Sequence, residues 1–257
     1  MDSTQSSDQS HAVQKAPTRD EVMKVPCGIP ALDESLGGLP ERSIILILGD
    51  TESGLNVCAQ QILFHGLSAG RSGVYFTSSR PSGDVTQEMK LYGWDLTAYV
   101  EKGLATFIDA FSSKLGRVPG QVSWDIGPAN MFAKEFPPIV KRLGSITLVL
   151  DSVTDLAKST AFRNVEGVIK NLQLTVRTLG GVYLLLAHRG VHTEQELNSL
   201  RHLSDGVIEL STEPFGSEEF AKRMKIAKMP WSISEAKLYA FRLGPGGIEM
   251  AALHRIK

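Results

Sequence analysis

Short, uninterrupted apolar runs alternate with helical patterns along most of this sequence, and that alternation limits the fold more than any other feature. The runs are four to six residues long and rich in β-branched side chains, as is typical of strands buried on both faces of a parallel sheet. Helical spacing of apolar residues appears at 55–69 and 165–179. We expect strands at residues 44–48, 74–77, 105–109, 146–150, 182–187 and 206–210. The pattern predicts an α/β fold with a mostly parallel central sheet and helices on both faces.

The two ends of the chain differ from this middle region. Residues 222–228, 238–243 and 246–250 are predicted as C-terminal antiparallel strands, because turn-forming Pro and Gly residues separate them. Residues 1–22 are rich in Ser, Gln and Asp and show no periodicity, so we expect a disordered N-terminal tail. The remaining residues, 23–257, have a suitable length for a single α/β domain.

Composition excludes several classes of protein. The 27 Lys and Arg residues are balanced by 28 Asp and Glu residues, so no global field attracts the chain to nucleic acid or to an acidic membrane. The two cysteines, Cys27 and Cys58, form neither a CxxC pair nor a ligand-spaced cluster, which excludes a disulfide framework and a cysteine zinc site. The apolar runs are too short to cross a bilayer. We therefore expect a cytoplasmic protein without membrane insertion.

A glycine-bearing segment joins the first expected strand to the first expected helix, which is where open α/β sheets bind ligands. The spacing of its two glycines matches the phosphate-binding pattern GxxxxGK[ST], in which backbone N–H groups cradle phosphates, Lys reaches the outer phosphates and Ser or Thr holds magnesium. The last two positions hold Leu and Asn instead. The segment consists of Gly49, Asp50, Thr51, Glu52, Ser53, Gly54, Leu55 and Asn56.

Five further segments give this loop a family context. They read GIPALDESLGG at 28–38, YGWDL at 92–96, LVLDS at 148–152, DGVI at 205–208 and KIAKM at 225–229. Together they resemble the KaiC-like branch of the RecA superfamily, from about Val25 to the C-terminus. The resemblance implies a three-layer RecA-like P-loop NTPase fold. It also implies that residues 49–56 are a degenerate nucleotide-binding (Walker A) loop and that Asp151 is a Walker B-like aspartate.

The chain departs from that family at three places that the resemblance assigns to ATP hydrolysis. Family members that hydrolyse ATP have Lys and then Thr or Ser where this chain has Leu55 and Asn56. Their catalytic glutamate pair aligns with Ser79 and Arg80, and neither a hydroxyl nor a guanidinium can act as the base that activates water. Near the C-terminus, Lys228 is kept as a candidate inter-subunit residue, but a proline takes the place of the family arginine.

The loop also carries the wrong charge for a polyphosphate. Asp50 and Glu52 add two negative charges, and no basic residue lies between Gly49 and Asn56, so the loop repels the anion that it would otherwise attract. We consider two further hypotheses: one of these carboxylates fills the anion-binding nest in place of phosphate, or Arg80 supplies the missing positive charge. No cofactor is expected, and ATP and Mg²⁺, if they bind, should bind weakly.

Asp151 has two interpretations. It ends an apolar strand as a Walker B aspartate does, and in that role it would coordinate magnesium through water. The structural alternative is a carboxylate that caps the next helix or bonds the loop. We favour the structural alternative because Asn56 replaces the Ser or Thr that normally shares the metal.

Two weaker signals have ordinary explanations. His188 and His192 are four residues apart, but the intervening Gly190 argues against a helix that faces both to one metal, so we expect loop or core histidines. The stretch 220–257 has a net charge of +6. It could bind DNA or an acidic neighbour in a ring, whereas solvated strand faces are the simpler explanation.

These features predict a KaiC-like, RecA-fold pseudo-ATPase that does not hydrolyse ATP. It would act as a regulatory or structural partner, in a homo-oligomer or beside an active RecA/KaiC-like paralogue. The runner-up is an ATP-binding protein or slow ATPase of the KaiC/RecA type in signalling, motility or DNA repair. A third hypothesis is a DNA-binding recombination accessory protein that uses the basic C-terminal strands.

Overall fold

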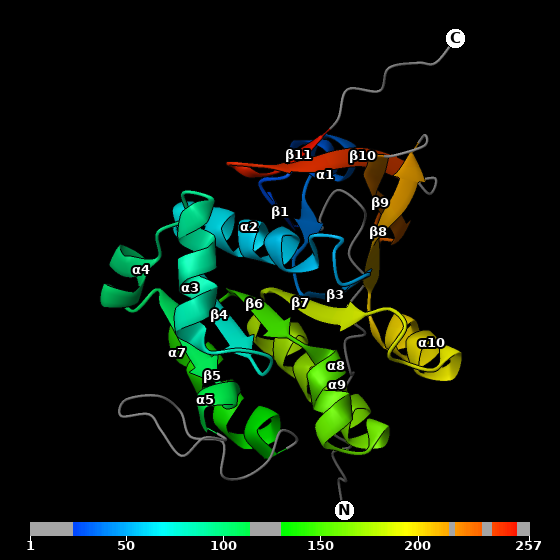
Figure 1. Ribbon diagram of the computed structural model, residues 1–257. Helices are drawn as coiled ribbons and strands as arrows, with labels where there is room; N and C mark the ends of the chain where they lie inside the picture. The colour runs from blue at the N-terminus through cyan, green and yellow to red at the C-terminus, as the bar shows by residue number, and fades with distance from the viewer. Residues whose placement is uncertain (1–22, 114–129, 216–218, 233–237, 251–257) are drawn as a thin grey trace, which may run out of the picture.

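The computed structural model in Figure 1 describes residues 23–113, 130–215, 219–232 and 238–250. The tail expected at 1–22 lies outside these residues. Within them, the chain forms a central sheet with helices on both sides, so the α/β prediction is confirmed. Among the described helices, none combines the length and the apolar character that crossing a bilayer requires.

Within the described residues, the central sheet has nine strands in the order β11-β10-β9-β8-β3-β7-β6-β4-β5. The strands from β8 to β5 are mutually parallel, and β9, β10 and β11 are antiparallel, as the sequence predicted. A separate two-stranded sheet pairs β1 (Lys24–Val25) with β2 (Leu39–Pro40). The strands of the central sheet are β3 (Ser43–Gly49), β4 (Ser72–Thr77), β5 (Ala105–Asp109), β6 (Ile146–Asp151), β7 (Val182–His188), β8 (Gly206–Phe215), β9 (Glu219–Lys228), β10 (Leu238–Gly244) and β11 (Gly247–Met250).

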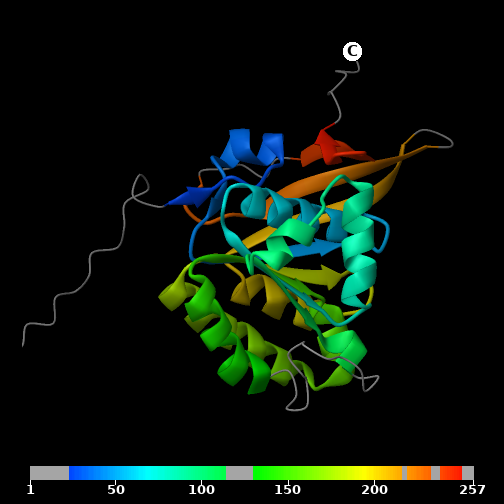
Figure 2. The ribbon, with the colours of Figure 1, turned by 90° about the vertical axis from the view of Figure 1, so that its left-hand side faces the viewer.

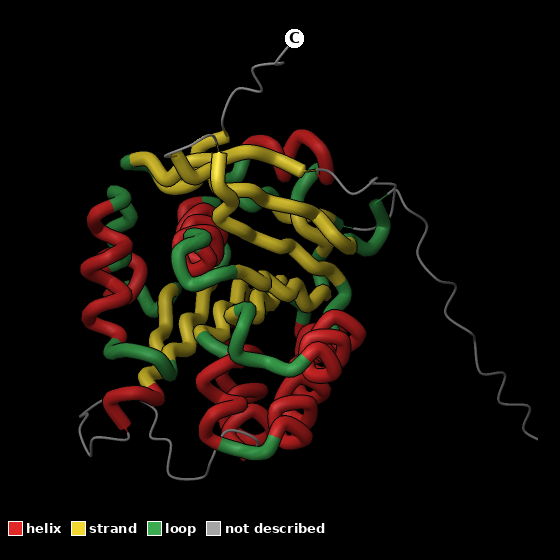
Figure 3. Tube along the Cα trace, turned by 45° about the vertical axis from the view of Figure 1, so that its right-hand side comes forward, coloured by secondary structure: helices red, strands yellow, loops and turns green. Residues whose placement is uncertain are grey.

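Helices on the two faces of the sheet make three layers (Figure 2). One side holds α1 (Pro30–Leu36), α2 (Leu55–Ser68), α3 (Ser82–Leu91) and α4 (Thr97–Glu101). The antiparallel strands curl over α2, so this helix packs between the parallel strands and β11 (Figure 3). The other side holds α5 (Ala110–Ser113), the π-helical turn η2 (Met131–Glu135), α7 (Phe136–Leu143), α8 (Val153–Ser159), α9 (Phe162–Leu179) and α10 (Glu194–Leu203).

Burial on both faces explains why the parallel strands are uninterrupted apolar runs. Along β3, Ile45 and Ile47 belong to the cluster around α2, whereas Ile44, Leu46 and Leu48 belong to the cluster around α7 to α10. All five side chains are fully buried, and each contributes about 1.5–3 kcal/mol through loss of contact with water. Alternate residues thus serve opposite layers, and no polar position is needed.

Among the described strands, β8 differs most in length from the strand that the sequence predicted. It continues to Phe215, whereas the sequence predicted a strand at 206–210 only. The added residues pair antiparallel with β9, and Glu213 and Pro214 face solvent. They therefore produce no continuous apolar run that sequence analysis could detect.

The carboxyl ends of five neighbouring parallel strands meet at one edge of the sheet. These ends are Gly49 of β3, His188 of β7, Asp151 of β6, Thr77 of β4 and Asp109 of β5. Segments that are far apart in the sequence, including the loop 49–56 and the predicted Walker B residue, are thereby collected at the place where α/β sheets bind ligands.

Candidate functional site at the carboxyl edge of the sheet

Residues 49–56 connect the end of β3 to the start of α2, as predicted. Gly49 is flanked in register by His188 of β7 and Leu210 of β8. Gly54 caps α2 with φ of 85°, a left-handed backbone that favours glycine. The loop therefore stands at the place that the resemblance gives to a phosphate-binding loop.

Ser53 is a buried residue of this loop that bonds to the loop backbone. Its side chain is fully buried, and its N–H and its hydroxyl both donate to the carbonyl oxygen of Asp50, at 3.0 and 2.6 Å. A Cβ atom on Gly49 would lie 2.4 Å from Ser53 Oγ, so this position needs glycine whether or not phosphate binds. Within the described residues, the carboxylates of Asp50 and Glu52 accept no hydrogen bond from the loop. The hypothesis that one of these carboxylates fills the anion-binding nest therefore has no hydrogen bond in the described structure to support it.

Leu55 stands at the position of the missing lysine, and its surroundings are apolar. Leu55 is 2% exposed and belongs to the hydrophobic cluster around α2. Asn56 is half-buried. A cation does contact the loop from β9, because the ammonium of Lys222 donates to the carbonyl oxygen of Glu52. Lys222 lines a shallow pocket of about 480 Å³ together with Asp50, Thr51, Glu52, Thr212 and Phe220.

Asp151 is buried at 1% exposure, and only one of its two carboxylate oxygens has a hydrogen-bond partner among the described residues. Its Oδ2 accepts a 2.7 Å hydrogen bond from the hydroxyl of Tyr75 in β4, while Oδ1 is buried with no partner among the described residues. Burial raises the pKa of this carboxyl, against the lowering effects of the Tyr75 hydrogen bond and nearby Arg80. Neither of the predicted structural roles is present: Ser152 caps α8, and in the described structure Asp151 makes no hydrogen bond to the loop.

A polar cluster surrounds this aspartate, formed by Gln60 of α2, Tyr75, Arg80, Glu88 of α3 and Asp151. Arg80 forms an ion pair with Glu88, and Gln60 Nε2 donates to the same Glu88 oxygen at 3.0 Å. Burial and the Asp151 charge raise the pKa of Tyr75 well above its usual value. Arg80 is thus neutralised inside the cluster, which argues against the hypothesis that it replaces the loop lysine.

Ser78 and Ser79 behave differently although they are neighbours. Ser79, aligned with one glutamate of the resembled family, is exposed. Ser78 is buried and links β4 to β6: its N–H donates to the Asp151 carbonyl oxygen at 2.7 Å, and its hydroxyl accepts from the Ser152 N–H at 3.2 Å. The role of Ser78 could not be predicted from the sequence, because a serine beside two other polar residues gives no distinguishing signal.

Lys228, the candidate inter-subunit residue, has an intramolecular role. Its ammonium donates to the carbonyl oxygens of Ser204 at 2.7 Å and Arg201 at 3.4 Å, at the end of α10. A cation in this place satisfies carbonyl groups that have no partner within the helix and complements the helix dipole. The inter-subunit role stays a prediction.

His188 and His192 belong to no group of metal-binding side chains in the described part of the chain. The side chain of His192 is 2% exposed, its Nε2 lies 2.9 Å from Thr154 Oγ1, and burial lowers its pKa. The described residues contain no group of three His, Cys, Asp or Glu side chains that could hold a metal ion.

Several basic residues of the C-terminal stretch have partners within the described part of the chain. Arg223 lies 3.9 Å from Glu213, and Arg242 lies 2.8 Å from Glu249. Lys222 and Lys228 donate to carbonyl oxygens, as described above. Lys237, Arg255 and Lys257 lie outside the described residues. Glu249 is already part of the +6 count, so only the Glu213 contact lowers it, by one charge. DNA binding stays a prediction.

Comparisons with known proteins agree on one family. A profile of the KaiC ATPase family matches residues 25–255. A UPF0273 protein of Pyrococcus furiosus is 27% identical over 240 residues, which cover 88% of this chain and 93% of that protein. A UPF0273 protein of Thermotoga maritima is 27% identical over 233 residues, which cover 88% of this chain and 95% of that protein.

A solved structure gives the same result. The crystal structure of a KaiC-like protein from the hyperthermophilic archaeon Pyrococcus horikoshii matches with a TM-score of 0.74 and 25% identity, over 90% of this chain and 100% of the other. This match confirms the three-layer RecA-like fold that the resemblance implied. Because the family profile spans residues 25–255, the chain belongs to the KaiC ATPase family.

Proposed function

We propose that this KaiC-family chain is a pseudo-ATPase that does not hydrolyse ATP and serves as a regulatory or structural partner in an oligomer. The observation that carries the proposal is Leu55, which stands at the position of the P-loop lysine and is buried in the core. The second support is the absence of a carboxylate at Ser79 and Arg80, so these positions offer no general base for attack on a phosphate.

The residues at the loop do not fit magnesium and ATP in the manner of the family. Mg²⁺ requires oxygen ligands in a near-octahedral arrangement, but Asn56 replaces the hydroxyl ligand and Asp151 is buried with one oxygen bound to Tyr75. Loss of one charged donor weakens binding by about ten- to a hundredfold, or ~1.5–3 kcal/mol. The charges of Asp50 and Glu52 weaken it further.

A partner role is supported by large apolar side chains that remain exposed. Trp231 is 45% exposed and holds φ of 58°, an uncommon backbone for a bulky residue. Phe220 of β9 is 73% exposed, and exposed aromatic residues often anchor protein interfaces. The partner would be a second copy or an active paralogue of the same family. A cytoplasmic setting accords with Cys27 and Cys58, which are free and buried.

Isothermal titration of the full chain with ATP, with and without Mg²⁺, tests the nucleotide half of the proposal. We expect no saturable heat up to about 1 mM ligand, and no release of phosphate in a parallel assay. Saturable binding at micromolar concentration would contradict the proposal and favour an ATP-binding protein or slow ATPase.

The double variant L55K/N56T is the matched control, because it returns the two family residues to an otherwise unchanged loop. Its affinity for ATP should rise about tenfold or more over the natural chain, without hydrolysis. Sedimentation of the natural chain at increasing concentration tests the homo-oligomer. If only monomers form, the partner is restricted to a paralogue.

A further inference from the structure

In the part of the chain that the structure describes, the central sheet ends at β5, and no other strand pairs with the outer edge of β5. The Gly73 N–H donates to the Leu104 carbonyl oxygen at 2.8 Å. Leu104 thus directs its C=O group toward β4. Because alternate residues of a strand direct their backbone groups to opposite sides, the backbone groups of Thr106 also face β4. The N–H and C=O groups of Ala105 and Phe107 point outward. In the described part of the chain, no backbone group meets Ala105 or Phe107 on that side.

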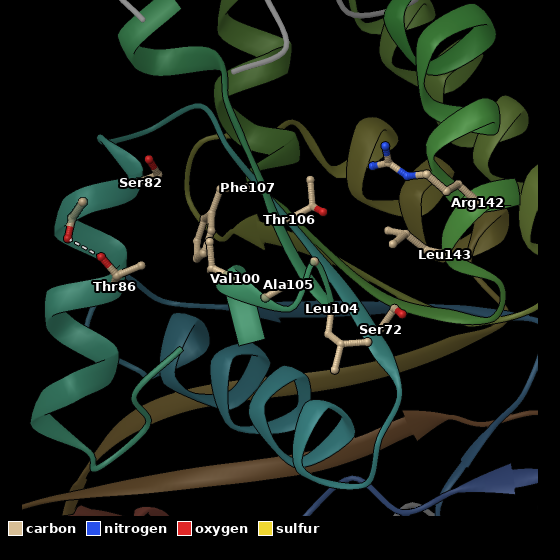
Figure 4. A pocket seen from close by; sticks show the side chains of 12 residues that line it. Ser72, Ser82, Thr86, Val100, Leu104, Ala105, Thr106, Phe107, Arg142 and Leu143 are labelled. Atoms are coloured by element: carbon tan, nitrogen blue, oxygen red, sulfur yellow. Dashed lines mark hydrogen bonds between the residues drawn. The ribbon is translucent and has the colours of Figure 1, made fainter. Parts of the chain in front are cut away.

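This edge opens into a pocket of about 850 Å³, called here the β5 pocket. Figure 4 shows Ser82 and Thr86 of α3 on one side and Arg142 and Leu143 at the end of α7 on the other, with β5 between them. The two walls thus leave a slot along the strand. The arrangement is notable because natural proteins usually cover or charge an open sheet edge.

The two faces of β5 give the pocket two different chemical surfaces. On the α4 side, Val100 and Phe107 are apolar, and Val100 is 46% exposed. On the α7 side, Thr106 lies toward Arg142 (Figure 4). Among the described residues of the lining, Arg142 alone is charged, and its exposed guanidinium has no hydrogen bond or ion pair with another described residue.

We propose that the β5 pocket is a docking site for an extended, acidic segment of a partner polypeptide, which adds a tenth strand to the sheet. Its backbone would pair with Ala105 and Phe107, as in other cases of strand addition. Because side chains alternate along a strand, apolar residues would contact Val100 and Phe107, and carboxylates on the opposite face would meet Arg142. The proposal rests on the partner role given above but involves no nucleotide. ATP binding by the chain would therefore contradict the pseudo-ATPase proposal and leave this one standing.

Fluorescence anisotropy with labelled peptides of about nine residues tests the site. One peptide alternates Val and Glu, a second alternates Val and Lys, and a third is the first with alternate backbone amides N-methylated. The full chain should bind the first peptide with Kd of about 10–300 μM and the other two at least about tenfold more weakly. No binding by the first peptide up to about 1 mM, or equal binding by all three, would overturn the proposal.

Variants on α7 supply the charge control. Arg142→Glu should weaken the Val/Glu peptide about tenfold and improve the Val/Lys peptide, because it reverses the only charge of the lining. Lys141→Glu makes the same change one residue away, on a side chain that lines a different groove, and should leave both affinities within about twofold. Equal effects of the two variants would show that only net charge matters and would contradict a docked strand.

Hydrogen exchange locates the peptide. Binding should slow exchange at the amides of Ala105 and Phe107, whereas Thr106, already paired to β4, should not change. Protection at another surface would overturn the assignment. Self-association of the natural chain that protects the same two amides, and that Arg142→Glu abolishes, would also overturn it, since the edge would then belong to a second copy.

Discussion

Asp109 and Asp151 are the same residue type at the same kind of position, the carboxyl end of a parallel strand, and they are almost equally buried at 2% and 1% exposure. Their surroundings are opposite. The two oxygens of Asp109 accept hydrogen bonds from the Ser82 N–H at 2.8 Å, the Ser112 N–H at 2.7 Å and the Ser112 hydroxyl at 2.9 Å. Asp151 accepts one from Tyr75, and its Oδ1 has no partner in the described structure.

The pKa values of the two carboxyls shift in opposite directions for this reason. Burial acts to raise the pKa of both groups, but the donors of Ser82 and Ser112 outweigh it at Asp109, where the pKa is lowered. At Asp151 burial outweighs the Tyr75 hydrogen bond, and the pKa is raised. Asp109 therefore anchors the starts of α3 and α5 and stabilises the fold, whereas Asp151 is a carboxylate that the fold does not require.

Replacement of the anchoring carboxylate should have the largest effect. Asp109→Ala leaves two backbone N–H groups without an acceptor, and we expect the free energy of unfolding to fall by about 3–5 kcal/mol. Urea denaturation at pH 7 measures it. The control is Asp84→Ala, an exposed carboxylate on the first turn of α3, which should change stability by less than about 0.5 kcal/mol. A loss below about 1 kcal/mol for Asp109→Ala would mean that its hydrogen bonds are not structural.

The contrast between these aspartates shows where sequence analysis succeeds and where it stops. The runs at 44–48, 146–150 and 182–187 fixed the strands, because a strand that is buried on both sides must be apolar throughout. The same runs place Gly49 and Asp151 at one edge, since parallel strands end together. The location of the site was therefore predictable from local sequence.

The partners of the site residues were not predictable. Tyr75 and Asp151 are 76 positions apart, and Lys222 and Glu52 are 170 apart, so each pair depends on strand order and register. Polar residues at a strand end have many partners of suitable chemistry. The sequence alone does not say which one the register selects.

Removal of the Tyr75 hydroxyl, which donates the hydrogen bond to the Asp151 carboxylate, should have the next largest effect. Tyr75→Phe leaves the buried carboxylate without a hydrogen bond, so the free energy of unfolding should fall by about 1–3 kcal/mol at pH 7. The loss should shrink near pH 4, where the carboxyl is more protonated. Tyr183→Phe is the control, because that hydroxyl is buried with no partner among the described residues, and its removal should be neutral or stabilising. Equal losses in both variants would point to packing instead.

At Asp109, removal of one donor should cost less, because others remain. Ser112→Ala deletes the 2.9 Å hydroxyl bond but keeps the backbone bonds from Ser82 and Ser112. We expect a loss of about 1 kcal/mol in urea denaturation. A loss larger than that of Tyr75→Phe would reverse the order of dependence between the two carboxylates and break the comparison.

Asp151→Asn should have the smallest effect at pH 7, a change of less than about 1 kcal/mol in either direction, since Asn can still accept from Tyr75. Its pH dependence is more informative. A folded pKa above the unfolded value of about 3.9 means that ionisation destabilises the fold as pH rises, and Asn removes this penalty. The stability of Asp151→Asn relative to the natural chain should therefore improve from about pH 4 to 7.

Asp109→Asn should do the opposite, because a lowered pKa supplies stability that is present above about pH 4 and lost as pH falls through the folded pKa. Urea denaturation from below about pH 4, where the Asp109 contribution is lost, up to about pH 7, where the Asp151 penalty is present, gives both curves. Parallel curves for the two variants would show that Asp109 and Asp151 respond alike to burial, whatever their hydrogen bonds.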